Sequence, residues 1–122
     1  MRQRYTTVTI ADEGTVSGTF IPPAWTKHVG AIFPAMDNGT VGMEISLNGT
    51  DFFTLSDPQD DGTALVIQAS GVDPSAIDLS YFLYPFIGNF SNGSAQITPV
   101  FRFKAATTQS TGAVTITVTF KD

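Results

Sequence analysis

The side chains that most often carry catalysis are scarce in this 122-residue sequence, which has a single histidine, His28, and no cysteine. A metal site built on imidazole would need further ligands from carboxylates, and a Ser-His-Asp relay would have to use this one ring. His28 follows Lys27 at the expected start of a strand, where an exposed or hydrogen-bonded histidine is common. The sequence therefore predicts a protein that is not an enzyme, without catalytic residues, a cofactor or a metal ion.

An acidic loop near the middle of the chain is the best candidate for a metal site. Asp57, Gln59 and Asp61 stand at its first, third and fifth positions, with Gly62 sixth, which is how a calcium-binding loop begins. The twelfth position is Gln68, which cannot supply the bidentate carboxylate, and no helices are expected on either side. We therefore interpret this segment as a solvated acidic turn.

Aromatic side chains are the other group that could act, through binding and not through catalysis. Five of them fall between residues 81 and 90, in a segment with neither the period of a helix nor that of a strand. Core packing and an exposed interaction surface are both open for this cluster, because apolar patches rimmed by polar residues mark interfaces. The single tryptophan and two arginines near the N-terminus present the same choice. The candidate protein-interface residues are Trp25, Tyr81, Phe82, Tyr84, Phe86, Phe90, Arg2 and Arg4.

Turn signals and alternating apolar residues indicate the elements that position these side chains. Asn38-Gly39, Asn48-Gly49 and Asp61-Gly62 accept the positive φ angles of tight hairpins, and segments of period two lie beside them. Residues 114–120 alternate Val, Ile and Phe with Thr and form the clearest strand in the sequence. We expect strands over residues 5–10, 15–21, 29–33, 40–47, 52–55, 64–69, 101–105 and 114–120.

This pattern predicts an all-β fold, an antiparallel β-sandwich of about eight or nine strands that is either jelly-roll-like or immunoglobulin-like. Residues 1–122 are expected to form a single domain, with residues 1–5 as a short basic arm or a frayed terminus. Residues 64–69 are almost wholly apolar, which is typical of a strand covered on both faces. Residues 73–75 could open a helical turn, and residues 88–93 are expected to be a loop.

Charge and composition argue against several classes of partner. The formal net charge is −5 and the six basic residues are scattered, whereas nucleic acids and anionic membranes attract clustered Lys and Arg. No apolar run approaches the roughly 18 residues of a membrane span, and the N-terminal segment lacks the apolar region of a secretory signal. We therefore expect no nucleic-acid partner and no membrane association.

Several short motifs resemble those of a family of small structural proteins encoded by tailed bacteriophages. They comprise a strand that ends in proline, a second strand followed by a glycine turn, a strand with an arginine between apolar residues, a polar loop with glutamine and a final Thr-rich strand. The resemblance covers about two-thirds of the chain. The matching residues are Gly30-Ala31-Ile32-Phe33-Pro34, Met43-Glu44-Ile45-Ser46, Asn48-Gly49-Thr50, Phe53, Asp57, Val100-Phe101-Arg102-Phe103, Gln109 and Thr115 to Val118.

The resemblance implies a virion component with a β-sandwich fold and no catalytic residues. The expected role is a capsid decoration or cement protein, made in the bacterial cytoplasm, which binds the major capsid protein and copies of itself on the capsid exterior. In that role, Arg2 and Arg4 could pair with acidic residues of the coat. A tail, neck or baseplate component needs the same kinds of contact and is an alternative. A carbohydrate-binding module, with Trp25 and Tyr81 or Tyr84 as its aromatic platform, is the alternative from another class.

Overall fold

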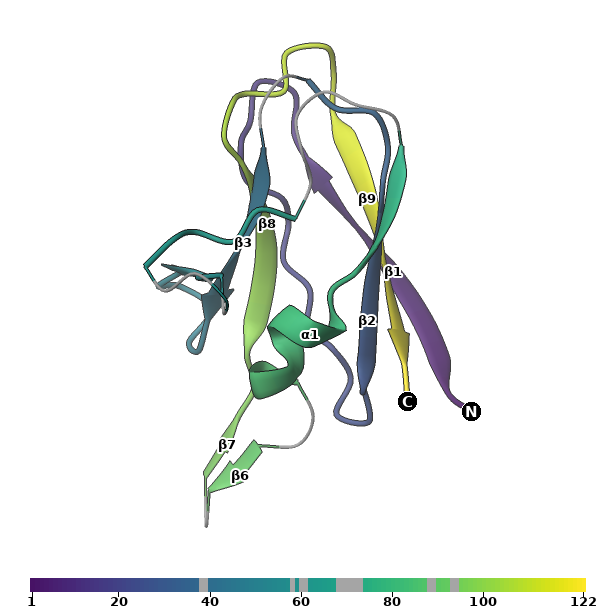
Figure 1. The fold of residues 1–122 in the computed structure, drawn as a ribbon, viewed down its shortest axis with the longest axis vertical. Coiled ribbons are helices and arrows are strands. Elements are labelled where there is room, and N and C mark those ends of the chain that lie inside the picture. Colours follow the sequence, from purple (N-terminus) through teal and green to yellow (C-terminus); the bar gives the residue numbers. More distant parts are fainter. Residues whose placement is uncertain (38–39, 58, 60–61, 68–73, 88–89, 93–94) are drawn as a thin grey trace.

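The computed structural model shows two antiparallel β-sheets on either side of a common core (Figure 1). It describes residues 1–37, 40–57, 59, 62–67, 74–87, 90–92 and 95–122. The helical segments are α1 (Ser80–Leu83) and the 3₁₀ turn η1 (Tyr84–Phe86). The strands are β1 (Gln3–Ile10), β2 (His28–Phe33), β3 (Val41–Ser46), β4 (Phe53–Thr54), β5 (Ser75–Asp78), β6 (Phe90–Asn92), β7 (Ala95–Ile97), β8 (Val100–Ala105) and β9 (Val114–Lys121).

The larger sheet, sheet A, has the strand order β1-β9-β2-β5. β9 is an interior strand, and it pairs with β1 from Gln3 opposite Lys121 to Ile10 opposite Val114. The Val, Ile and Phe side chains of β9 are buried, whereas its threonines lie on the outer face. The alternation predicted for this segment is therefore confirmed.

The smaller sheet, sheet B, has the strand order β4-β3-β8. β3 and β8 pair in continuous register from Val41 opposite Ala105. Phe101 and Phe103 of β8 have no exposed surface, and the ring of Phe103 meets Phe33 of β2 edge-on at 5.2 Å between centroids. The two sheets are thus joined through aromatic rings that the strand period directs inward.

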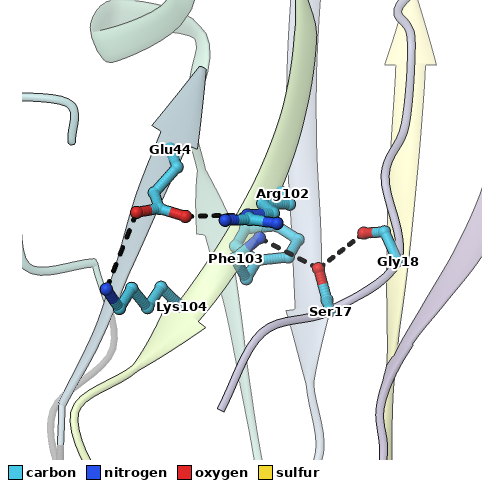
Figure 2. Close-up of polar contacts among 6 residues, drawn as sticks. All are labelled: Ser17, Gly18, Glu44, Arg102, Phe103 and Lys104. Carbon is cyan, nitrogen blue, oxygen red and sulfur yellow. Dashed lines mark hydrogen bonds and ion pairs between the residues drawn. The ribbon is translucent and has the colours of Figure 1, made fainter. Parts of the chain in front are cut away.

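The two sheets contain seven strands in the described part of the chain, four in sheet A and three in sheet B, so the expected eight or nine is wrong. The predicted strand over residues 15–21 makes only isolated bridges, to β8 and to Ile10 of β1. There the hydroxyl of Ser17, and not a backbone carbonyl, accepts the N–H of Phe103 at 2.9 Å (Figure 2). A serine side chain that takes a backbone partner in this way interrupts the ladder.

The predicted strand over residues 64–69 is also irregular in its described part, residues 64–67. The N–H groups of Leu65 and Ile67 donate to two different neighbouring segments, so no continuous ladder forms. Leu65 and Ile67 are buried, whereas Val66 is 55% exposed. The expectation of a strand covered on both faces is therefore wrong.

The stretch after residue 73 differs most from the expectations. Residues 74–75 lead into strand β5 and not into a helical turn, because pairing with the edge of β2 overrides a local capping signal. Residues 90–92, expected in a loop, form β6, which pairs with β7 in a hairpin that projects beyond β8 (Figure 1). No helix in the described residues is long and apolar enough to cross a membrane.

A polar clamp joins the loop after β2 to the loop before β9. The carboxylate of Asp37 accepts hydrogen bonds from the backbone and the hydroxyl of both Ser110 and Thr111. Gln109 is 1% exposed, and its Oε1 accepts the N–H of Asp37 at 3.1 Å. The bonds donated by Thr111, then by the Ser110 backbone, lower the pKa of Asp37 below its usual value.

Candidate interaction surface

The aromatic turn, residues 80–86, comprises α1 and η1 and lies against β2 beside the end of β5 (Figure 1). Its first residue is bonded to sheet A, since the Oγ of Ser80 accepts the N–H of Val29 at 3.0 Å. Leu79, just before it, donates its N–H to the carbonyl of Val29 at 2.8 Å. Asp78 of β5 accepts the N–H of Ser80 through Oδ1 at 2.9 Å. These bonds fix the start of the turn to the framework.

The aromatic turn divides its side chains between the core and solvent. Leu83 is fully buried, and Phe82 and Phe86 are half-buried against the core cluster. Tyr81 and Tyr84 are 60% and 75% exposed. The question left open by the sequence therefore has a divided answer: the leucine and phenylalanines anchor the turn, and the two tyrosines face solvent.

The other predicted interface residues lie apart from these tyrosines. Phe90 begins β6, and its side chain lies outside what the structure describes. Trp25 is half-buried in the loop before β2, and the guanidinium of Arg2 lies 5.9 Å from the centre of its ring. Arg4 is an exposed residue of β1, opposite Phe120. Among the described residues, no ring contact joins the tryptophan to the aromatic turn.

The single histidine lies beside a shallow hollow of about 550 Å³ on the outer face of sheet A. Gly30 lies in this hollow between Thr119 and Asp78, and a Cβ at Gly30 would come within 2.8 Å of the Thr119 hydroxyl. The backbone and side-chain hydrogen bonds from Ser80, and to a smaller extent the charge of His28, lower the pKa of Asp78. The described residues contain no group of three His, Cys, Asp or Glu side chains that could hold a metal ion.

The acidic loop, compared above with a calcium-binding loop and interpreted as a solvated turn, is described only in part. Asp61 and Gln68 lie outside the described residues, as does Asp60. The Oδ1 of Asp57 accepts the N–H of Gln59 at 2.9 Å, which is the arrangement of an Asx-turn.

A charged cluster on sheet B unites two motifs of the phage resemblance. Glu44 of β3 is 6% exposed, and its carboxylate lies 2.7 Å from the Nε of Arg102 and 3.7 Å from the Nζ of Lys104 (Figure 2). The guanidinium of Arg102 also lies 3.7 Å from the centre of the Phe52 ring. A buried carboxylate needs such partners. The arginine between apolar residues therefore binds β8 to β3.

Several exposed apolar side chains were not recognised from the sequence. Tyr5, Phe53 and Ile32 are 71%, 64% and 49% exposed. The period of the strands could have identified Tyr5, because it shares the outward parity of Thr7 and Thr9, which are both exposed.

Comparisons with known proteins do not assign this chain to a family. No family model matches the sequence, and no curated protein matches it. The crystal structure of the SPBc2 prophage-derived protein YomS is similar over 98% of this chain and 95% of that chain, with 11% identity and a TM-score of 0.45. A structure of Bacillus endospore appendages, a family of disulfide-linked pili, is similar over 98% of this chain and 87% of that chain, with 12% identity and a TM-score of 0.35. Neither likeness carries an argument about function.

Proposed function

We propose that this chain is a non-enzymatic structural protein of a tailed-bacteriophage virion. In this proposal it decorates or cements the outside of the capsid by binding the major capsid protein and copies of itself. The aromatic turn carries the proposal, because it presents Tyr81 and Tyr84 to solvent from a base that is bonded to sheet A. The motifs that resemble phage structural proteins support the class of protein.

The strand order supports the jelly-roll form of the sandwich. The first strand, β1, pairs with the last strand, β9, in sheet A, and residues 15–20 reach β8 of sheet B through isolated bridges. Double-sheet jelly rolls occur in viral capsid proteins and in lectins. In an immunoglobulin sandwich the first and last strands lie in different sheets, whereas β1 and β9 pair here.

Adhesion would be the mechanism. Burying the exposed faces of Tyr81 and Tyr84 in a coat-protein pocket would contribute roughly 25 cal/mol per Å² of apolar area, against the cost of association. The turn is already ordered by Leu83 and Ser80, so little further ordering is needed on binding. Many copies on one symmetric shell would make weak single contacts sufficient.

The test is the number of copies of this chain in purified virions encoded by the source genome, measured by quantitative mass spectrometry against the coat protein. A copy number comparable to that of the coat protein is expected for a decoration or cement protein. A few to a few dozen copies would instead favour the tail, neck or baseplate alternative. Absence from the particle would overturn the virion proposal.

A carbohydrate-binding module is the second candidate. It is favoured by two exposed tyrosines, Tyr81 and Tyr84, close in sequence to the carboxylate of Asp78. Sugars bind to aromatic faces with polar groups beside them. Binding to a glycan array that is lost in a Tyr81→Ala variant would support this function. Silence across a broad array would count against it.

A further inference from the structure

β1 is an edge strand whose outer edge is open over five residues. Its even-numbered residues bond to β9, as shown by the Asp122 N–H that donates to the carbonyl of Arg2. The odd-numbered residues therefore direct their N–H and C=O groups away from β9. At Thr9 this outer carbonyl accepts the N–H of Gly18, which covers the end of the strand. Among the described residues, none bonds to the outer backbone groups of Gln3, Tyr5 or Thr7.

This open edge has little of the protection that natural edge strands carry. Residues 3–7 are Gln, Arg, Tyr, Thr and Thr, without the proline, lysine or bulge that usually prevents further pairing. Tyrosine and threonine favour strands. The one charge is Arg4, which limits the registers that a second strand can adopt.

We infer that two copies of this chain pair through β1, antiparallel, about a twofold axis at Tyr5. In this register the hydrogen-bonded pairs are Gln3 with Thr7 of the second copy, Tyr5 with its own equivalent, and Thr7 with Gln3. These are the residues whose outer backbone groups have no partner among the residues that the structure describes. The bond between Thr9 and Gly18 stays in place.

Charge disfavours one of the neighbouring registers. A shift that centres the pair on Arg4 would place the two Arg4 side chains directly opposite, which is unfavourable. With Tyr5 at the axis, each Arg4 lies opposite Thr6. Antiparallel pairing also directs each basic N-terminus, with Arg2, toward the acidic turn at Asp12 and Glu13 of the other copy.

The pair joins two four-stranded sheets into one continuous sheet of eight strands. Both Tyr5 side chains, 71% exposed in the single chain, then lie side by side on its outer face. The aromatic turn stays free, since it lies beside β5 at the opposite edge of sheet A (Figure 1). The inference deepens the proposed function by naming how copies of this chain contact each other.

Proline substitutions test the outer and the inner hydrogen-bonding edges of β1 separately. Tyr5→Pro removes an N–H that points outward, whereas Thr6→Pro removes one that bonds to β9. In sedimentation velocity at protein concentrations from micromolar to millimolar, the wild type is expected to form a reversible dimer. Tyr5→Pro should abolish the dimer with little change in melting temperature, and Thr6→Pro should lower the melting temperature sharply. Tyr5→Thr keeps the N–H and should still dimerise. A wild type that stays monomeric throughout, or a Tyr5→Pro variant that still dimerises, would overturn the inference.

The register has its own test, which does not depend on a proline variant folding. The chain has no native cysteine, so any disulfide that forms must join introduced cysteines. Arg4→Cys combined with Thr6→Cys places two thiols opposite each other in non-hydrogen-bonded pairs, at a Cα separation that suits a disulfide. Oxidation should give a covalent dimer, and Arg4→Cys alone should not. The opposite pattern would overturn the register.

Failure of this inference and failure of the proposed function give different results. A dimer formed in solution by a chain that is absent from virions would overturn the proposed function and leave the β1 pairing intact. A chain that is abundant on capsids yet monomeric in solution, with no cross-link, would do the reverse.

Discussion

Aromatic side chains have opposite fates in β8 and in the aromatic turn. Phe101 and Phe103 of β8 have no exposed surface, whereas Tyr81 and Tyr84 are mostly exposed. A strand sends every second side chain to the same face, so β8 commits both rings to the core. The aromatic turn passes from an α-turn to a 3₁₀ turn and spreads consecutive side chains around its axis, so only some of them reach the core. The backbone that carries an aromatic residue, more than its type, decides whether it is available to a partner.

The strongest test of this contrast is a pair of truncations. Phe103→Ala should lower the free energy of unfolding by about 3–5 kcal/mol, because it leaves a cavity between the two sheets. Tyr84→Ala should change it by no more than about 0.5 kcal/mol, because its side chain lies largely in water. Urea denaturation of both variants would measure the difference. Equal losses would mean that the aromatic turn is as much a part of the core as β8.

Substitution of the outward-facing charged residues of β8 should give the next largest change in the free energy of unfolding. Arg102→Met should cost about 1–3 kcal/mol, because Glu44 is buried and loses its closest partner. Lys104→Met is the matched control and should cost under about 1 kcal/mol, since the lysine is 3.7 Å away and 54% exposed. Thermal or urea denaturation would rank the two. A larger effect for the lysine would contradict the assignment of Arg102 as the main partner.

Acid should weaken the polar clamp that the Asp37 carboxylate makes with Ser110 and Thr111. The folded-state pKa is lowered, so the ionised carboxylate favours folding above the unfolded value of 3.8, and this contribution is lost as the pH falls through the lower folded value. Asp37→Asn should therefore be less stable than the wild type at pH 7, and the gap should narrow below about pH 4. Melting temperatures of the two proteins across this range would show it. A gap independent of pH would mean that the charge of Asp37 contributes nothing.

Sequence patterns identified the parts of the fold in which local and tertiary preferences agree. β9 and β8 alternate cleanly, and both were predicted in position and orientation. Residues 15–21 also have the pattern of a strand. However, the Ser17 hydroxyl accepts the N–H of Phe103, which in a regular ladder would donate to a backbone carbonyl. This hydrogen bond depends on the position of β8 relative to Ser17, which the local sequence pattern does not predict.

The candidate surface shows the same limit. The concentration of aromatics between residues 81 and 90 located the right segment, but not which rings face outward. That division depends on the Ser80 bonds to β2 and on Leu83 filling the core, both of which are tertiary. Tyr5 was accessible to sequence reasoning through its strand parity, yet whether β1 is an edge strand depends on sheet order.

The smallest effect on stability should accompany the largest effect on binding. Tyr84→Asp places a charge on an already exposed position, so the free energy of unfolding should change by no more than about 0.5 kcal/mol. If the aromatic turn contacts the coat protein, the same substitution buries an unpaired carboxylate at that contact and should strongly reduce co-sedimentation with capsids that lack this chain. Phe53→Asp is the matched control, since Phe53 is 64% exposed on sheet B. Equal loss of binding in both variants would show that exposure alone matters. Loss in Tyr84→Asp alone would show that the arrangement of the aromatic turn, with its tyrosines held outward by a buried leucine, is what a partner recognises.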